Sequence, residues 1–439
     1  MQNKDADIKI QNGMVVTCNA VGDILDNGGI VIKQGRIAAV GTMEDLNSWT
    51  AKETIDATGC VVMPGLVNAH THLPMSLFRG LADDIPLMTW LNDYIFPAEA
   101  AHITPETVRI GALLSCAELL LSGTTTCCDG YFYEDSVAEA VFETGIRCIA
   151  GQGVIDYPAP GVPDPLKNIA AAISYVEKWA GRTSLITPSI FCHSPYTCSK
   201  ETLVRSRNEA AFRGVLFQIH LAETKSEYDQ IKKTHGVSPV TYLDIINVLR
   251  PGTLLVHAVW VDEDDRKRIA DRGAGVAHNP ESNMKLASGV APIPELIRLG
   301  VPVGLGTDGS ASNNNLDLFE EMSSAAKLHK VNRMDPTIMD AKTVLNMATA
   351  EGADAIGLGK VVGSLEVGKM GDVIVLDMQK PHLVPMYHPI SHIVYAAKGS
   401  DVRDVIVNGK VLVKDGRLLT IDLEKLFERV AEAGRLIKK

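Results

Sequence analysis

The sequence predicts an α/β protein: a (β/α)8 barrel, the TIM-barrel architecture, with a small discontinuous β-sandwich domain made from the two chain ends. Three observations predict it. The 439 residues exceed one average domain but suit a large barrel with a small partner. Eight short apolar runs alternate with helical segments in the middle of the chain. Both ends have the pattern of β-hairpins.

The two ends show apolar runs interrupted by turn residues. Residues 8–41 are broken at Asn12-Gly13, and residues 372–419 are broken at Asn408-Gly409, a dipeptide typical of tight hairpin turns. Neither end has enough strands to be stable alone, so we expect the two to pair. The predicted divisions are residues 1–62 (β-sandwich, first part), 63–358 (barrel) and 359–439 (β-sandwich, second part), with a closing amphipathic helix at Leu423–Ile437.

The predicted barrel strands are short runs rich in apolar and β-branched residues. They are Leu66–His72, Thr124–Cys128, Arg147–Val154, Leu185–His193, Val215–His220, Thr253–His257, Ala274–His278 and Val301–Thr307. Helical stretches separate them. One example is 104–121, which begins Thr-Pro-Glu and is followed by Gly123. Strands that alternate with helices form parallel sheets, and eight such units predict closure into a barrel.

The composition indicates a soluble globular protein and restricts its partners. Hydrophobic residues make up 46% and charged residues 22% of the chain, and the formal charge of −11 argues against nucleic acid or an anionic membrane as partner. We find no basic stretch followed by an apolar one at the start and no apolar span long enough to cross a bilayer, so we expect the cytoplasm. Eight cysteines without a CxxC pair are interpreted as small core residues.

Titratable residues end six of the eight predicted strands, where barrels of this kind build their active sites. They are His70, His72, His193, His220, His257, His278 and Asp308. Alternate strand residues point the same way, so His70 and His72 can converge on one metal. As an isolated pair they could equally be half-buried polar residues at a strand end. Seven titratable residues at six strand ends favour a functional site.

A single catalytic metal is the simplest interpretation of these residues. His70, His72 and His220 supply imidazoles, and Asp308 supplies a carboxylate at the end of the eighth strand. Glu223 follows the fifth strand, where a carboxyl group could move protons between water and substrate. It could equally be an acid that favours the start of the next helix through the helix dipole. The residues alone leave both interpretations open.

Five ordered motifs together resemble the amidohydrolase superfamily, and within it the 5′-methylthioadenosine/S-adenosylhomocysteine deaminase family. They are Pro64-Gly65-Leu66-Val67-Asn68-Ala69-His70-Thr71-His72, His193-Ser194-Pro195-Tyr196-Thr197, His220-Leu221-Ala222-Glu223-Thr224, His278-Asn279-Pro280-Glu281-Ser282-Asn283-Met284-Lys285-Leu286 and Gly306-Thr307-Asp308-Gly309-Ser310-Ala311-Ser312-Asn313-Asn314. Together with the β modules at both ends, the resemblance covers nearly the whole chain.

The resemblance implies hydrolytic deamination of an adenine nucleoside, such as 5′-methylthioadenosine, S-adenosylhomocysteine, adenosine or 5′-deoxyadenosine, to its inosine analogue and ammonia. It implies one divalent metal, zinc in the first place, on His70, His72, His220 and Asp308. Glu223 would protonate the purine N1, Asp308 would take a proton from the attacking water, and His257 would orient that water. Substrate contacts would come from Glu99, His193, Trp90, Glu223 and Asp308. Two-metal relatives carry a lysine on the fourth strand, and Leu185–His193 has none.

Other interpretations remain open at this point. The same barrel could act on guanine, oxidised guanine, a pterin or an s-triazine, and Glu99 discriminates because a ribose-binding acid serves no purpose with a free base. A non-catalytic barrel would have lost metal ligands. The sequence leaves the 5′ substituent, self-association and the role of Gln218 undecided. His278 is expected to bind backbone or a carboxylate rather than substrate, and four histidines are expected at the surface or at helix caps: His102, His235, His329 and His382.

Overall fold

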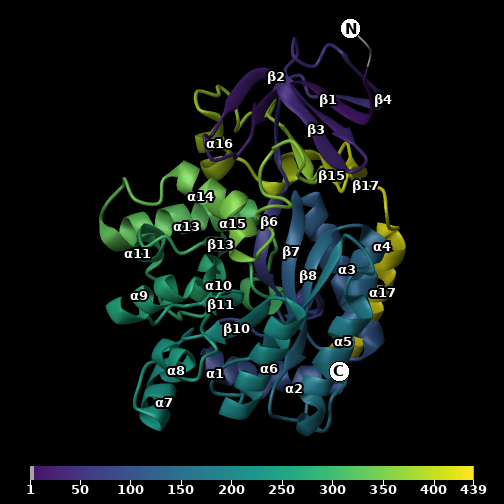
Figure 1. Cartoon of the computed structure of the whole chain (residues 1–439). Coiled ribbons are helices and arrows are strands. Elements are labelled where there is room, and N and C mark those ends of the chain that lie inside the picture. Colours follow the sequence, from purple (N-terminus) through teal and green to yellow (C-terminus); the bar gives the residue numbers. More distant parts are fainter. Residues whose placement is uncertain (1–3, 439) are drawn as a thin grey trace.

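The computed structural model describes residues 4–438, which form a barrel and a separate β-sheet (Figure 1). The sheet, at the top of Figure 1, combines purple N-terminal strands with yellow-green C-terminal ones. The barrel lies below it and is formed by the middle of the chain. The predicted α/β fold class is therefore confirmed. The predicted domain boundaries at 62/63 and 358/359 stay a prediction.

Eight parallel strands form the barrel, in the order in which they occur along the chain. They are β6 (Leu66–Thr71), β7 (Thr124–Tyr131), β8 (Arg147–Val154), β9 (Ile186–Cys192), β10 (Phe217–Leu221), β11 (Thr253–His257), β12 (Gly275–His278) and β13 (Val303–Leu305). Each of the eight predicted runs overlaps one of these strands, but β7 extends three residues beyond the predicted Thr124–Cys128 and β10 one residue beyond the predicted Val215–His220. The last predicted run, Val301–Thr307, contains only three residues of strand.

Contacts between the first and the last strand close the barrel next to the predicted site. Thr71 and Asp308 form an isolated parallel bridge, and the Asp308 N–H donates to the carbonyl of His70 at 3.0 Å. The Thr71 hydroxyl donates to the Asp308 carbonyl at 3.1 Å. Barrel closure therefore brings His70 and His72 beside Asp308, although more than 230 residues separate them in the chain.

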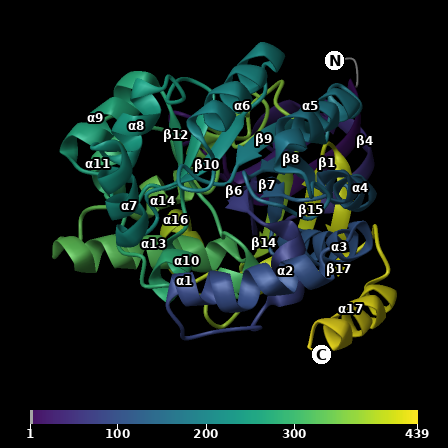
Figure 2. The same cartoon turned by 90° about the horizontal axis from the view of Figure 1, so that it is seen from below.

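Helices surround the strands, as the view from below shows (Figure 2). The helical segments are η1 (Leu73–Phe78), α1 (Leu87–Thr89), η2 (Trp90–Ile95), α2 (Phe96–His102), α3 (Pro105–Leu121), α4 (Glu134–Thr144), η3 (Pro165–Lys167), α5 (Asn168–Trp179), α6 (Lys200–Arg213), α7 (Lys225–His235), α8 (Pro239–Ile245), α9 (Glu263–Arg272), α10 (Pro280–Lys285), α11 (Ile293–Arg298), α12 (Ser310–Asn313), α13 (Leu318–Arg333), α14 (Ala341–Met347), α15 (Ala350–Ala355), α16 (Pro389–Tyr395), η4 (Gly399–Asp401) and α17 (Leu423–Ile437). Thr104 caps α3 by accepting the Thr107 N–H. Within residues 4–438, no helix has the length and apolar character needed to cross a membrane.

The separate sheet joins both ends of the chain in one hydrogen-bonded unit of nine strands. They are β1 (Lys4–Val16), β2 (Ile24–Lys33), β3 (Arg36–Thr42), β4 (Trp49–Asp56), β5 (Cys60–Pro64), β14 (Val373–Asp377), β15 (Val402–Val407), β16 (Lys410–Lys414) and β17 (Arg417–Leu418). The order is β17-β16-β15-β14-β5-β1-β2-β3, with β4 beside β1. The ends meet where β14 pairs antiparallel with β5. The two ends therefore depend on each other for a complete sheet.

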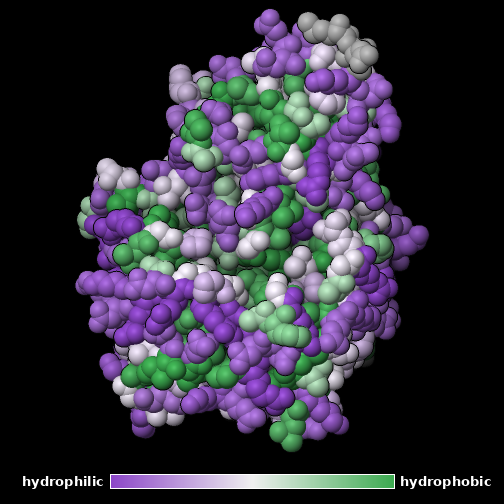
Figure 3. Space-filling model, in the orientation of Figure 1, coloured by the Kyte–Doolittle hydropathy of each residue, from purple (hydrophilic) through white to green (hydrophobic). Residues whose placement is uncertain are grey.

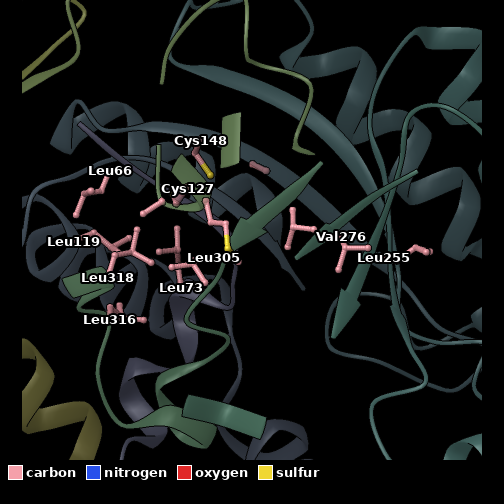
Figure 4. Packing of buried hydrophobic residues seen from close by; sticks show 14 of the residues in the cluster. Leu66, Leu73, Leu119, Cys127, Cys148, Leu255, Val276, Leu305, Leu316 and Leu318 are labelled. Carbon is pink, nitrogen blue, oxygen red and sulfur yellow. The ribbon is translucent and has the colours of Figure 1, made fainter. Parts of the chain in front are cut away.

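Apolar side chains from the strands and the surrounding helices form the main core (Figure 4). Leu66, Leu119 and Leu318 meet there from β6, α3 and α13, and all three are fully buried. All eight cysteines are buried and free, as expected of small core residues. On the face shown in Figure 3, hydrophilic residues are interspersed with apolar ones.

A buried ion pair connects the barrel to the sheet. Arg147, at the start of β8, donates from Nε and Nη2 to the two carboxylate oxygens of Asp372 at 2.9 and 3.0 Å. Both side chains are almost fully buried, at 3% and 2% exposure. Asp372 also accepts the Asn408 N–H at 2.7 Å. A bidentate arginine–carboxylate pair has a fixed geometry, so this pair holds the sheet in one position against the barrel.

We expect Arg147→Met to lower the free energy of unfolding by about 3–5 kcal/mol, because it leaves the buried Asp372 carboxylate unpaired. The control is Lys52→Met, which removes an ion pair with Asp7 whose side chains are 83% and 35% exposed and should lower the stability far less, because solvent screens an exposed pair. Urea unfolding followed by circular dichroism measures both. Equal effects of the two substitutions would contradict the role of the buried pair.

Candidate metal centre and active site

Four side chains from distant parts of the chain converge at the carboxyl ends of the barrel strands. Ligand atoms of His70, His72, His220 and Asp308 all lie within 4.8 Å of one another. The Nε2 atoms of His70 and His220 are 3.3 Å apart. Asp308 Oδ1 lies 3.6 Å from His70 Nε2 and 3.3 Å from His72 Nε2. Three imidazoles and one carboxylate in this arrangement are the donor set of a catalytic zinc site.

Neighbouring groups turn the ligand atoms inward. His72 Nδ1 lies 2.6 Å from the carbonyl oxygen of Gly130, and because a carbonyl only accepts, this nitrogen carries the proton. Nε2 is thereby left with a free lone pair that faces the cluster. Asp308 Oδ2 accepts from the hydroxyls of Ser282 and Ser312 at 2.7 and 3.0 Å, which leaves Oδ1 facing the histidines. Such outer contacts fix the orientation of metal ligands.

The protonation states in the cluster suit a cation. Burial lowers the pKa of His70 to about 4 and that of His220 well below its ordinary value, so both imidazoles are neutral. Burial raises the pKa of Asp308, but the interactions of its carboxylate with His70 and the other nearby histidines outweigh this effect. The pKa of Asp308 is therefore held well below the usual range. The cluster therefore presents bare nitrogen lone pairs and a carboxylate to one point. A divalent metal ion fits that donor set.

Strained backbone accompanies the site. His257 and Asp308 have φ values of 73° and 59°, and Ala222, between His220 and Glu223, has φ 49°. Side chains other than glycine rarely adopt this left-handed region, and it recurs at functional sites where the surroundings enforce it. The sharp turns at these strand ends direct the side chains over the mouth of the barrel.

Glu223 and His257 lie beside the ligand cluster. Glu223 Oε2 is 3.7 Å from His257 Nε2. Burial, together with the negative charge of Asp308, raises the pKa of Glu223 to about 8, so the carboxyl group is protonated at neutral pH. The side-chain amides of Asn279 and Asn283 both lie 3.1 Å from Nδ1 of His257. Glu223 can therefore donate a proton, and the two asparagines hold the His257 ring.

A cavity of about 660 Å³ extends from the cluster to the surface. Its lining includes all the predicted substrate-contact residues: Trp90, Glu99, His193, Glu223 and Asp308. The elements α1, η2 and α2 form one wall, and in Figure 1 α1 and α2 lie at the end of the barrel away from the sheet. Trp90 is 5% exposed and donates its indole N–H to the carbonyl of Ala82 at 3.1 Å. It is both a core residue and a cavity wall.

Glu99 is held by a partner that the sequence analysis missed. The Tyr131 hydroxyl donates to Oε1 of Glu99, and both side chains are buried. Burial raises the pKa of Glu99 to about 7, although this hydrogen bond opposes the rise. Tyr131 ends β7, two residues after Asp129, whose carboxylate accepts the Leu73 N–H at 2.5 Å. With Gly130, three consecutive residues of β7 thus organise the site.

Other residues singled out in the sequence lie outside the cluster. His278 does not line the cavity, and its Nε2 lies 3.1 Å from Nε2 of His329. The partner of His278 is therefore a histidine and not backbone or a carboxylate. The expectation that His329 is a surface or capping residue was wrong, because α13 packs inward and buries it fully. Gln218 donates to the Asp129 carbonyl at 3.1 Å and to the Ser189 hydroxyl at 2.8 Å, away from the ligand atoms.

Comparison with known proteins places this geometry in a family. The model of the amidohydrolase family matches residues 61–412. The chain belongs to the amidohydrolase family. It is 49% identical, over the full length of both chains, to a 5-methylthioadenosine/S-adenosylhomocysteine deaminase of Syntrophobacter fumaroxidans.

Two further relatives have related activities. A 5′-deoxyadenosine deaminase of Methanothermobacter thermautotrophicus is 45% identical over 94% of this chain and 96% of its own. The crystal structure of an adenosine deaminase from Xanthomonas campestris with bound zinc superimposes with a TM-score of 0.97 at 35% identity and covers 99% of both chains. The amidohydrolase resemblance and the barrel with its terminal sheet are thereby confirmed.

We expect His220→Ala to reduce the bound metal from about one ion per chain to near zero, because one of four ligand atoms is lost. The control is His193→Ala: His193 also ends a strand and lines the cavity, but its Nδ1 lies 2.9 Å from the Thr197 hydroxyl and it is not one of the four ligand residues. Inductively coupled plasma mass spectrometry of the purified variants measures the metal. Retention of metal by His220→Ala would contradict the ligand assignment.

Proposed function

We propose that the protein hydrolytically deaminates adenine nucleosides, among them 5′-methylthioadenosine, S-adenosylhomocysteine, 5′-deoxyadenosine and adenosine, to the inosine analogue and ammonia. One observation carries the proposal: three of the four ligand residues (His72, His220 and Asp308) line a single cavity together with Glu223, His257 and the buried acid Glu99. The deaminase activities of relatives 49% and 45% identical over nearly the whole chain support it.

One divalent ion, zinc in the first place, would be held by His70, His72, His220 and Asp308. Such an ion, when bound, lowers the pKa of water toward neutrality and so supplies a nucleophile. The similar structure with bound zinc supports the choice of metal.

Glu223, Asp308 and His257 would divide the proton chemistry. The protonated Glu223 would donate to N1 of the purine, which makes C6 a better electrophile. The ionised Asp308 would take a proton from the attacking water. His257, whose ring is held by Asn279 and Asn283, would orient that water and stabilise the charge that develops on its oxygen. The proton that Asp308 has taken would then pass to the leaving amino group, which departs as ammonia. As the C6 carbonyl forms, the remaining hydroxyl proton would pass to Glu223 and restore its protonated state.

Glu99, His193 and Trp90 would bind the rest of the nucleoside. Tyr131 occupies one oxygen of Glu99 and leaves the other for the ribose hydroxyls. A ribose-binding acid has no partner in a substrate without ribose. Glu99 therefore favours a nucleoside over the alternative substrates guanine, oxidised guanine, pterin and s-triazine. All four metal ligands are present, which argues against a non-catalytic barrel.

A turnover assay tests the proposal. The metal-loaded protein is incubated with methylthioadenosine, S-adenosylhomocysteine, adenosine and guanine, and ammonia release and the adenine-to-hypoxanthine absorbance change are followed. We expect turnover of adenine nucleosides and none of guanine. Absence of turnover with every adenine nucleoside would contradict the proposal.

We expect Glu223→Gln to keep its metal and to lose about 10²–10⁴-fold in kcat, because an amide cannot supply the proton. Glu201→Gln, on the outer helix α6 with a side chain 79% exposed, is the matched control and should keep full activity. Steady-state kinetics and metal analysis on the same preparations measure both. Near-normal kcat in Glu223→Gln would show that another group donates the proton.

Substitution of Glu99 tests the ribose contact. We expect Glu99→Gln to lower kcat/KM for methylthioadenosine about 10- to 100-fold, because this factor corresponds to the free energy of a hydrogen bond to a charged group. With the 2′,3′-dideoxy analogue of methylthioadenosine the substitution should have little effect, because the hydroxyls are already missing. An equal loss with both substrates would contradict the contact.

A further inference from the structure

The charged residues that line the cavity are, apart from histidines, all acidic. They are Glu99, Glu223, Glu227 and Asp308. Among the residues of the 4–438 range that line the cavity, none is lysine or arginine. Asn92 and Gln230 add neutral polar groups. The cavity therefore offers hydrogen bonds to a substrate but no full positive charge from a side chain that could pair with an anion.

Two lysines that lie within two residues of lining residues in the chain, Lys285 and Lys225, have partners elsewhere. Lys285, beside the lining residue Leu286, donates to Asp83 at 2.5 Å and also contacts Asn314. Lys225, at the start of α7, pairs with Asp229 and lies 5.7 Å above the Trp260 ring. Each of these two cations has an anionic partner of its own outside the cavity lining.

The walls away from the metal centre are mostly apolar. One wall comprises Leu87, Met88, Leu91 and Phe96, and the loop after β8 contributes Ile155, Tyr157, Pro158, Ala159 and Pro160. Apolar groups of a substrate gain free energy by leaving water for such surroundings. A carboxylate loses hydration there and finds no lysine or arginine among the lining residues with which it could pair.

Together, the acidic lining and the apolar walls indicate which 5′ substituents the cavity accepts. This inference rests on the proposed nucleoside deamination. We infer that the site selects adenine nucleosides with an uncharged, apolar 5′ group, such as methylthio or the methyl end of 5′-deoxyadenosine. It disfavours an amino-acid tail such as that of S-adenosylhomocysteine. The discrimination is against the carboxylate and not against the length of the tail.

A substrate series that separates charge from length tests this inference on the metal-loaded wild-type protein. It consists of methylthioadenosine, 5′-butylthioadenosine, 5′-(3-aminopropyl)thioadenosine and S-adenosylhomocysteine, each assayed for kcat/KM by ammonia release. We expect the butylthio substrate to exceed S-adenosylhomocysteine at least tenfold. The aminopropyl substrate, which lacks the carboxylate but keeps the ammonium, should also exceed it, because the lining is acidic.

The outcomes separate the inference from the proposed function. If kcat/KM for 5′-butylthioadenosine is less than tenfold that for S-adenosylhomocysteine, the inference is overturned, whether the two kcat/KM values are high or low. The proposed deamination would remain intact. If both long substrates are poor while methylthioadenosine is good, length rather than charge is selected and the inference fails. If no member of the series releases ammonia, the proposed function itself fails.

Discussion

The convergence of parallel strand ends is the constraint on which the site depends. In a closed barrel the carboxyl ends of all strands meet at one mouth, so residues 70, 72, 220 and 308 become neighbours although they are far apart in sequence. The ligand atoms then lie within 4.8 Å of one another, with nitrogen lone pairs and a carboxylate facing each other. The lone pairs of the neutral imidazole nitrogens repel one another in this arrangement unless a cation lies between them. The barrel supplies the geometry, and the metal would supply the attraction.

A shell of ordinary hydrogen bonds supports this arrangement. Ser282 and Ser312 hold one oxygen of Asp308, the Gly130 carbonyl fixes the proton of His72, and two asparagines hold His257. Gly130 lies near the end of β7, and the other groups lie on short segments after β12 and β13, all of which the barrel brings to the mouth. Side chains placed in this way would lose little freedom when a substrate binds, because their orientation is already set.

The sequence predicted the fold and the centre of the site because both leave periodic signals. Eight apolar runs alternating with helices indicated the barrel, and the placement of histidines at strand ends indicated the ligands. The partners of those residues left no such signal. Tyr131, beside Glu99, lies three residues beyond the predicted strand Thr124–Cys128, and only the packing of β7 against α2 in space reveals the contact. The burial of His329 likewise depends on which face of α13 packs inward, and the sequence alone did not indicate that face.

A zinc titration of the metal-free protein tests the central claim, that one ion on these four residues makes the barrel a deaminase. Chelator-treated protein is titrated with zinc while methylthioadenosine turnover is recorded. We expect no activity at the start, and a linear rise that saturates at one zinc ion per chain. Full activity before zinc is added, or saturation only at two ions per chain, would contradict it.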